Sequence, residues 1–341
     1  MAPDLSTPAG YLPVIFMALM GISLFLYVVL DGYDLGVGIL LPGATDHEKD
    51  IMVASIGPFW DANETWLVLG IGLLLVAFPV AHGIVLTSLY LPVVLMLIGL
   101  ILRGVAFDFR VKGRDHHKPL WNRLFWLGSV VAAAAQGFML GGYITGFATS
   151  WAARGFALLT AVCVPALYAL LGAGWLLIKT GGALQMKAVY WARRCWWGAL
   201  AGFIAVSTAS PLVSERIFEK WFSLPFVVLL APLPIVTLAL LLIAARSLAR
   251  LPVRLGQGNE YGIWVPFACT IGVIVIGFYG LTYSLFPYLV VDRLTIWQAA
   301  SAPESLLFIL VGALVVLPAI GGYTIYVYRV FRGKAQPLSY G

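Results

Sequence analysis

Long apolar runs alternate with short polar connections along the whole chain. Each run approaches or exceeds the ~20 residues that a helix needs to cross a bilayer. Only helices and closed barrels satisfy all backbone polar groups in lipid, and continuous runs favour helices. The pattern predicts an all-α integral membrane protein, a single polytopic domain over residues 1–341 with nine transmembrane helices at about 12–40, 51–78, 82–103, 122–147, 154–178, 195–213, 223–246, 262–287 and 304–328.

Composition agrees with this pattern. The chain is 61% hydrophobic and 11% charged, against roughly 25% charged in a soluble domain. The first run has no Lys or Arg ahead of it and is too long for a signal-peptide core, so we expect it to stay in the mature protein. Tryptophans near the run ends, among them Trp175 and Trp196, are typical of interfacial aromatic belts. The three isolated cysteines predict packing rather than a disulfide or metal site.

The basic residues are divided unequally between the two sides of the membrane. Nine spans place the termini on opposite sides, and 21 Lys and Arg residues can be sorted between them. Those on the N-terminal side are Arg154, Arg216, Lys220 and Arg293. Because positive charge favours the cytoplasmic side, we expect an external N-terminus and a cytoplasmic C-terminus. The net charge of +6 therefore fits anionic lipid head groups rather than nucleic acid.

Two acidic side chains interrupt the cytoplasmic half of the first span. Asp31 and Asp34 are three residues apart and share a helix face. Gly32 and Gly36 form a small-xxx-small surface that lets a second helix approach closely. A carboxylate at membrane depth is costly unless it is paired, hydrated or protonated. We therefore expect both acids to be buried against protein and to serve a function.

Two further acids, Asp61 and Glu64, lie on one face of the second predicted span. Starting that span at residue 51 places Asp61 about 15 Å along the helix axis, near the bilayer midplane. The four acids would then form a ladder from the cytoplasm towards the membrane centre. The alternative is that they only bond to neighbouring helices or to a buried arginine. Arg103 could be that partner, or an interface anchor that snorkels to the head groups.

The histidines are informative by their positions. His47, His116 and His117 fall in predicted cytoplasmic loops, and His82 falls in a short external connection. No predicted span therefore offers the buried imidazole that most haem sites need. The sequence also contains no nucleotide-binding, zinc-protease or nucleophile-elbow motif.

Three motifs together carry a family resemblance. They are LDGYDLGVG at 30–38, PFWDANETWL at 58–67 and LRGVAFDFR at 102–110. In this order and spacing, the chain resembles subunit II of the bacterial cytochrome bd-type quinol oxidases. The specific match covers about the first 110 residues, and chain length and span count agree over the rest. The Leu40-Leu41-Pro42 segment looks closest to the cyanide-insensitive branch.

The resemblance implies a heterodimer in the bacterial inner membrane. Each subunit would have two four-helix bundles plus a peripheral helix. Subunit I would ligate haems b and d and oxidise quinol, and oxygen would be reduced to water. This chain would ligate no cofactor, and the complex could include lipid, a bound structural quinone and small accessory subunits. Carried over by motif, Asp34, Trp60 and Asp61 would lie on the cytoplasmic proton route, which Asp31, Glu64 and Arg103 would shape.

Two other kinds of protein remain open. A secondary transporter or proton channel would function alone and bind its solute at the midplane, and the sequence shows no inverted repeat of that type. A purely structural scaffold would differ from the oxidase subunit only in that the acids conduct no protons.

Overall fold

The computed structural model describes residues 4–112 and 115–336. Arg114, in the basic connection between the third and fourth spans, lies outside the described residues. Over the described ranges, nine helical segments are long and apolar enough to cross a membrane. They are Pro8–Gly43, Trp60–Ala77, Tyr90–Arg110, Lys118–Ile144, Trp151–Lys179, Gly182–Val213, Phe226–Gly256, Val265–Leu285 and Pro303–Val330. The predicted all-α membrane fold is confirmed.

The chain divides into two compact units. Unit 1 contains the chain up to Asp31, Pro58–Tyr90 and Leu285–Arg332. Its elements are the first part of α1 (Pro8–Leu40), then α3 (Trp60–Ala77), α4 (Pro79–Ser88), the antiparallel strands β1 (Tyr288–Val290) and β2 (Leu294–Thr295), α13 (Ile296–Ala299) and α14 (Pro303–Val330).

Helices α3 and α14 of unit 1 pack against each other in opposite directions. The backbone N–H of Ser301, just before α14, donates to the carbonyl of Ala77 at the end of α3 (2.9 Å). At the other end of the pair, the hydroxyl of Tyr328 donates to Asn63 Oδ1, near the start of α3 (3.2 Å). These two bonds fix the antiparallel register.

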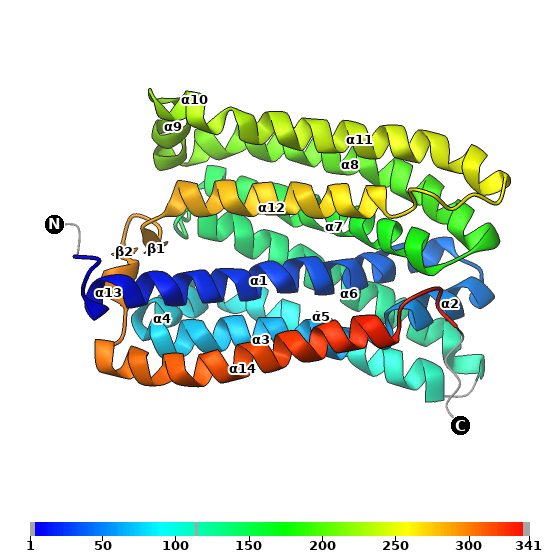
Figure 1. Ribbon diagram of the computed structural model, residues 1–341, viewed down its shortest axis with the longest axis horizontal. Coiled ribbons are helices and arrows are strands. Elements are labelled where there is room, and N and C mark those ends of the chain that lie inside the picture. Colours follow the sequence, from blue (N-terminus) through cyan, green and yellow to red (C-terminus); the bar gives the residue numbers. More distant parts are fainter. Residues whose placement is uncertain (1–3, 113–114, 337–341) are drawn as a thin grey trace. The chain divides into compact units, whose positions relative to one another are not determined.

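Unit 2 contains the rest of α1 and most of the remaining helices. Its elements are η1 (Leu41–Gly43), α2 (Asp46–Ile56), α5 (Tyr90–Lys112), η2 (Asp115–His117), α6 (Lys118–Ile144), α7 (Trp151–Lys179), α8 (Gly182–Val213), α9 (Glu215–Phe222), α10 (Phe226–Leu230), α11 (Pro232–Gly256) and α12 (Val265–Leu285). Helix α7 packs against α6 and α8, and α8 packs against α11, so these long helices run side by side (Figure 1).

Several predicted span boundaries are wrong. The predicted sixth span, 195–213, begins earlier, at Gly182, and the predicted seventh, 223–246, ends later, at Gly256. The predicted second span, 51–78, is interrupted, because α2 ends at Ile56 and α3 starts only at Trp60. Pro58 lies in this break and has no N–H with which to continue α2. The predicted third span, 82–103, combines part of α4 with part of α5, which continues past Arg103 to Lys112.

Two of the predicted interfacial tryptophans are internal. Trp175 is 5% exposed and its Nε1 donates to the carbonyl of Ser55 at 3.1 Å. Trp196 is 8% exposed and donates to the carbonyl of Leu241 at 2.9 Å. Each indole therefore joins two segments of unit 2, because a buried Trp N–H requires an acceptor.

Candidate functional site

The acids of α1 are completely buried. Asp31 and Asp34 both have no exposed surface, and they lie one turn apart near the cytoplasmic end predicted for this helix. Such burial of two carboxyl groups in a membrane helix is costly unless the groups are paired, hydrated or protonated. The expectation that both acids face protein is confirmed.

Close packing of α1 on α7 encloses Asp34. At Gly36 a side chain would overlap the carbonyl oxygen of Tyr168, and at Gly32 a Cβ would lie 2.8 Å from the Tyr168 ring. The two helices can approach this closely because these positions carry no side chain. Beside them, the ring of Tyr33 stacks on Trp175 with centroids 4.2 Å apart. The predicted small-residue surface is therefore a helix contact in unit 2.

Asp61 does not lie in the middle of a span. It belongs to the first turn of α3, and its side chain is exposed, while Trp60 and Glu64 are half-buried. A carboxylate in the first helical turn is stabilised by the positive end of the helix dipole. The predicted midplane position was wrong because the span was assumed to begin at residue 51. Asp61 therefore lies at the start of its helix and not ten residues into it.

Asn63, which no sequence pattern singled out, is fully buried in unit 1. Its Nδ2 donates to the carbonyl of Leu30 at 3.2 Å, and its Oδ1 accepts from the hydroxyl of Tyr328 at 3.2 Å. One amide thus joins α3 to α1, next to Asp31, and to α14. Asn63 lies within the second motif, but its side chain is uncharged, so it does not stand out as costly to bury in a membrane.

Arg103 is also placed differently from the prediction. Its side chain is 1% exposed, and α5 continues past it, so it is neither at a helix end nor an interface anchor. Helices α5 and α6 approach closely beside it, since a Cβ at Gly99 would lie 2.8 Å from the carbonyl oxygen of Gly128. This crossing buries the guanidinium, which fits the alternative in which Arg103 balances buried negative charge.

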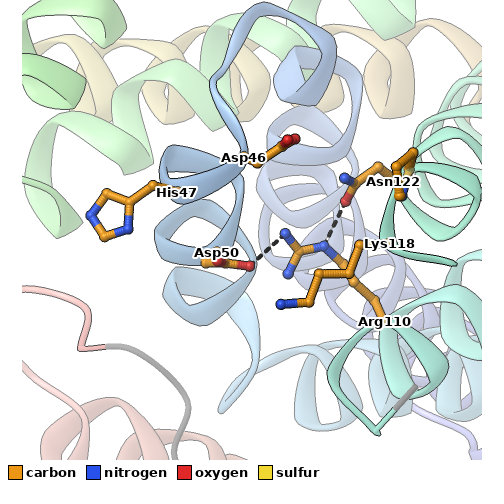
Figure 2. Close-up of a pocket in the computed structure, with 7 residues that line it drawn as sticks. Asp46, His47, Asp50, Arg110, Lys118 and Asn122 are labelled. Carbon is orange, nitrogen blue, oxygen red and sulfur yellow. Dashed lines mark hydrogen bonds and ion pairs between the residues drawn. The ribbon is translucent and has the colours of Figure 1, made fainter. Parts of the chain in front are cut away.

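A polar pocket of about 240 Å³ opens between α2, α5 and the start of α6. Figure 2 shows the Arg110 guanidinium between its two partners: Arg110 Nη2 lies 2.7 Å from Asp50 Oδ1, and Nε donates to Asn122 Oδ1 at 2.6 Å. Asp46, also in the pocket wall, accepts from Lys49 Nζ at 2.9 Å, which lowers the pKa of Asp46. The acidic side chains of the pocket are paired with basic ones, so these residues mainly hold α2, α5 and α6 together.

The start of α2 is held by a second ion pair. Lys187 Nζ of α8 lies 2.7 Å from Glu48 Oε2, and Thr45 and Glu48 form a capping box. Burial tends to raise the pKa of Glu48, but the hydrogen bonds from Lys187 and Thr45 outweigh it and lower the pKa. Glu48 therefore stays ionised at neutral pH and fixes α2 to α8 within unit 2.

No group of three or more His, Cys, Asp or Glu side chains could hold a metal ion in the described part of the chain. The histidines lie outside the nine spans: His47 in α2, His82 in α4, and His116 and His117 in η2. What the buried groups can do chemically is hold or pass protons.

The comparisons with known proteins agree over nearly the whole chain. A family model for cytochrome bd terminal oxidase subunit II matches residues 12–331. Cytochrome bd ubiquinol oxidase subunit 2 of Bacillus subtilis is 28% identical over an alignment of 345 positions, gaps included, that covers 92% of this chain and 95% of that protein. A probable cytochrome oxidase subunit 2 of Haemophilus influenzae is 27% identical over 95% of both chains.

A third relative matches part of the chain, and a solved structure matches nearly all of it. Cytochrome bd-I ubiquinol oxidase subunit 2 of Escherichia coli is 34% identical over 135 residues, 39% of this chain and 36% of that protein. The bd oxidase structure from Geobacillus thermodenitrificans matches 94% of this chain and 99% of its own with a TM-score of 0.70 at 17% identity, which shows the same fold. The chain therefore belongs to the family of cytochrome bd terminal oxidase subunit II.

Proposed function

We propose that this chain is the haem-free subunit of its quinol oxidase, and that its buried carboxyl groups carry protons from the cytoplasm towards the oxygen-reducing centre in subunit I. The observation that carries this proposal is the complete burial of Asp31 and Asp34 one turn apart in α1. Reduction of oxygen to water consumes protons, and a carboxyl group in a membrane interior can be both protonated and deprotonated.

The candidate site residues of the three motifs then take the following places. Asp61, exposed in the first turn of α3 beside Trp60, takes protons from water, and Glu64 lies one turn further along. Asp34 and Asp31 hold protons inside the protein, and the buried Arg103, in the same unit as Asp34, balances the negative charge of Asp34. In a purely structural scaffold, none of these carboxyl groups would gain or lose a proton during turnover. Experiments on variants that cannot titrate distinguish the two roles.

The haems belong to subunit I in this proposal. Haem iron is most often held by histidine, methionine or cysteine, and the nine spans of this chain contain no histidine. The residues of the nine spans therefore do not fit a histidine-ligated haem. Haems b and d and quinol oxidation are assigned to subunit I. Lipid, a bound quinone and small accessory subunits would complete the assembly.

The chain expressed without subunit I should contain no stoichiometric haem, because its spans lack a histidine ligand. Haem per polypeptide, measured by absorption after extraction into pyridine, should be near zero for the chain alone and should appear on co-expression with subunit I. One haem per isolated chain would overturn the proposal. Transport of a solute by the isolated chain in liposomes would favour the secondary transporter instead.

We further propose that the N-terminus is external and the C-terminus cytoplasmic, as the basic residues indicate. A reporter enzyme that is active only outside the cytoplasm should be inactive when fused in the connection between α5 and α6. The same reporter fused in the β1–β2 hairpin should be active. The reversed pattern would show that the orientation is wrong.

A further inference from the structure

Two uncharged side chains of unit 1, Trp66 and Thr324, each carry a buried polar atom that makes no hydrogen bond within the described residues. In the part of the chain that the structure describes, Trp66 Nε1 and Thr324 Oγ1 are buried and have no hydrogen-bond partner. Trp66 lies in α3 and is 5% exposed, and Thr324 lies in α14. Buried polar atoms in native proteins are almost always bonded to protein or to ordered water.

Trp66 differs from four other tryptophans of the chain. Four of them donate their indole N–H to a protein acceptor at 2.7 to 3.1 Å: Trp175, Trp196, Trp221 and Trp297. The indole N–H is a donor only, so Trp66 can be satisfied only by an acceptor brought to it.

Thr324 stands apart from the other helical threonines in the same way. A hydroxyl in a helix commonly bonds to the carbonyl four residues earlier, and several here do so: Thr160, Thr237, Thr270 and Thr282. The hydroxyl of Thr324 makes no such bond. Its rotamer therefore leaves both a donor and an acceptor available to a second molecule.

The helix register brings the two atoms to the same level. Asn63 of α3 is bonded to Tyr328 of α14, and the helices are antiparallel. Trp66 lies three residues after Asn63, and Thr324 lies four residues before Tyr328. Because the helices are antiparallel, moving forward along α3 and backward along α14 leads in the same direction in space. One turn in that direction from the Asn63–Tyr328 bond is Trp66 on α3 and Thr324 on α14.

We propose that Trp66 Nε1 and Thr324 Oγ1 together bind an ordered water molecule between α3 and α14. The water accepts from the indole and exchanges a hydrogen bond with the hydroxyl, which satisfies both atoms. Buried waters occupy such sites when two or more polar groups converge. The water would lie one helical turn from the hydrogen bonds that join the Leu30 carbonyl, Asn63 and Tyr328.

The functional consequence rests on the proposed function. A water one turn from Asn63 would lengthen the polar interior that begins beside Asp31 and would make α14 part of it. The binding site itself does not depend on proton transfer, so the two ideas can fail separately.

The direct test is a cryo-electron microscopy map of the purified oxidase at a resolution that shows water. A compact peak within about 2.6 to 3.2 Å of both Trp66 Nε1 and Thr324 Oγ1 is expected. The peak should be lost in Thr324→Val, which keeps the shape of the side chain, and in Trp66→Phe, which keeps an aromatic ring but removes the indole N–H. An empty site in the wild-type map, or density that extends into a larger ligand, would overturn the proposal.

A thermodynamic test covers variants that are too unstable for imaging. If one water serves both groups, the decreases in thermal midpoint for Trp66→Phe and Thr324→Val should sum to more than that of the double variant. Thr282→Val removes a hydroxyl of α12 that bonds within its own helix, so it should be additive with Trp66→Phe. Additive effects of Trp66→Phe and Thr324→Val would contradict a shared water. Oxygen consumption is not a readout of either test, so a failed proton route would not be mistaken for a missing water.

Discussion

Asp34→Asn should slow oxygen consumption by the assembled oxidase roughly tenfold or more, because positioned proton-transfer groups typically contribute 10²- to 10⁴-fold. Asparagine keeps the size of the side chain, and a completely buried site has no bulk water to replace the lost carboxyl group. Turnover per haem, measured with an oxygen electrode on purified complex, is the relevant quantity. The haem spectrum should be unchanged.

Asp61→Asn should have a smaller effect than Asp34→Asn. The side chain of Asp61 is exposed in the first turn of its helix, so water can deliver protons without it. Asp292→Asn is the matched control, since Asp292 is exposed between β1 and β2 and has a positive φ of 58° that asparagine tolerates. Full turnover in Asp34→Asn would remove this carboxyl from any obligatory proton route, and loss of haem would favour a structural role.

Gly36→Ala should lower the stability of the complex by at least about 1–3 kcal/mol, the usual cost of overpacking a tight core. The added methyl group would overlap the carbonyl oxygen of Tyr168 and lie 2.9 Å from the backbone nitrogen of Gly172. Both are backbone atoms, so α1 and α7 must separate. The thermal unfolding midpoint of purified complex measures the loss.

Gly72→Ala provides the control for this prediction. Gly72 is in the middle of α3, and a Cβ there would meet nothing within 4 Å. Alanine is the better helix former, so this variant should be neutral or more stable by up to about 1 kcal/mol. If Gly36→Ala were as stable as Gly72→Ala, the close contact of α1 with α7 would not exist in the folded protein.

The features that could be predicted from the sequence are those that depend on local composition. Apolar runs identified nine spans, and the spacing of Gly32 and Gly36 identified the face of α1 that meets another helix. Both follow from the periodicity of a helix and the need to bury its polar groups. The burial of Asp31 and Asp34 followed from the same reasoning.

The errors arose where tertiary packing decides the outcome. Residues 51–60 are mostly apolar, so the sequence suggested that the span begins at residue 51. The structure breaks the helix at Pro58 and starts α3 at Trp60, so the predicted depth of Asp61 was too great. The charge of Arg103 suggested the end of a span, but the close crossing of α5 and α6 buries it within one. Asn63 carries no charge, so only the contacts of α1, α3 and α14 show its role.

The most direct measurement is quinol-dependent oxygen uptake by material purified through an affinity tag on this chain. Purification from cells that also make subunit I should yield haem and oxygen uptake that stops when quinol is omitted. Purification from cells lacking subunit I should yield the chain with neither. Oxygen uptake by the chain alone, or recovery of the chain without subunit I from cells that make both, would contradict its place as the haem-free subunit of a cytochrome bd oxidase.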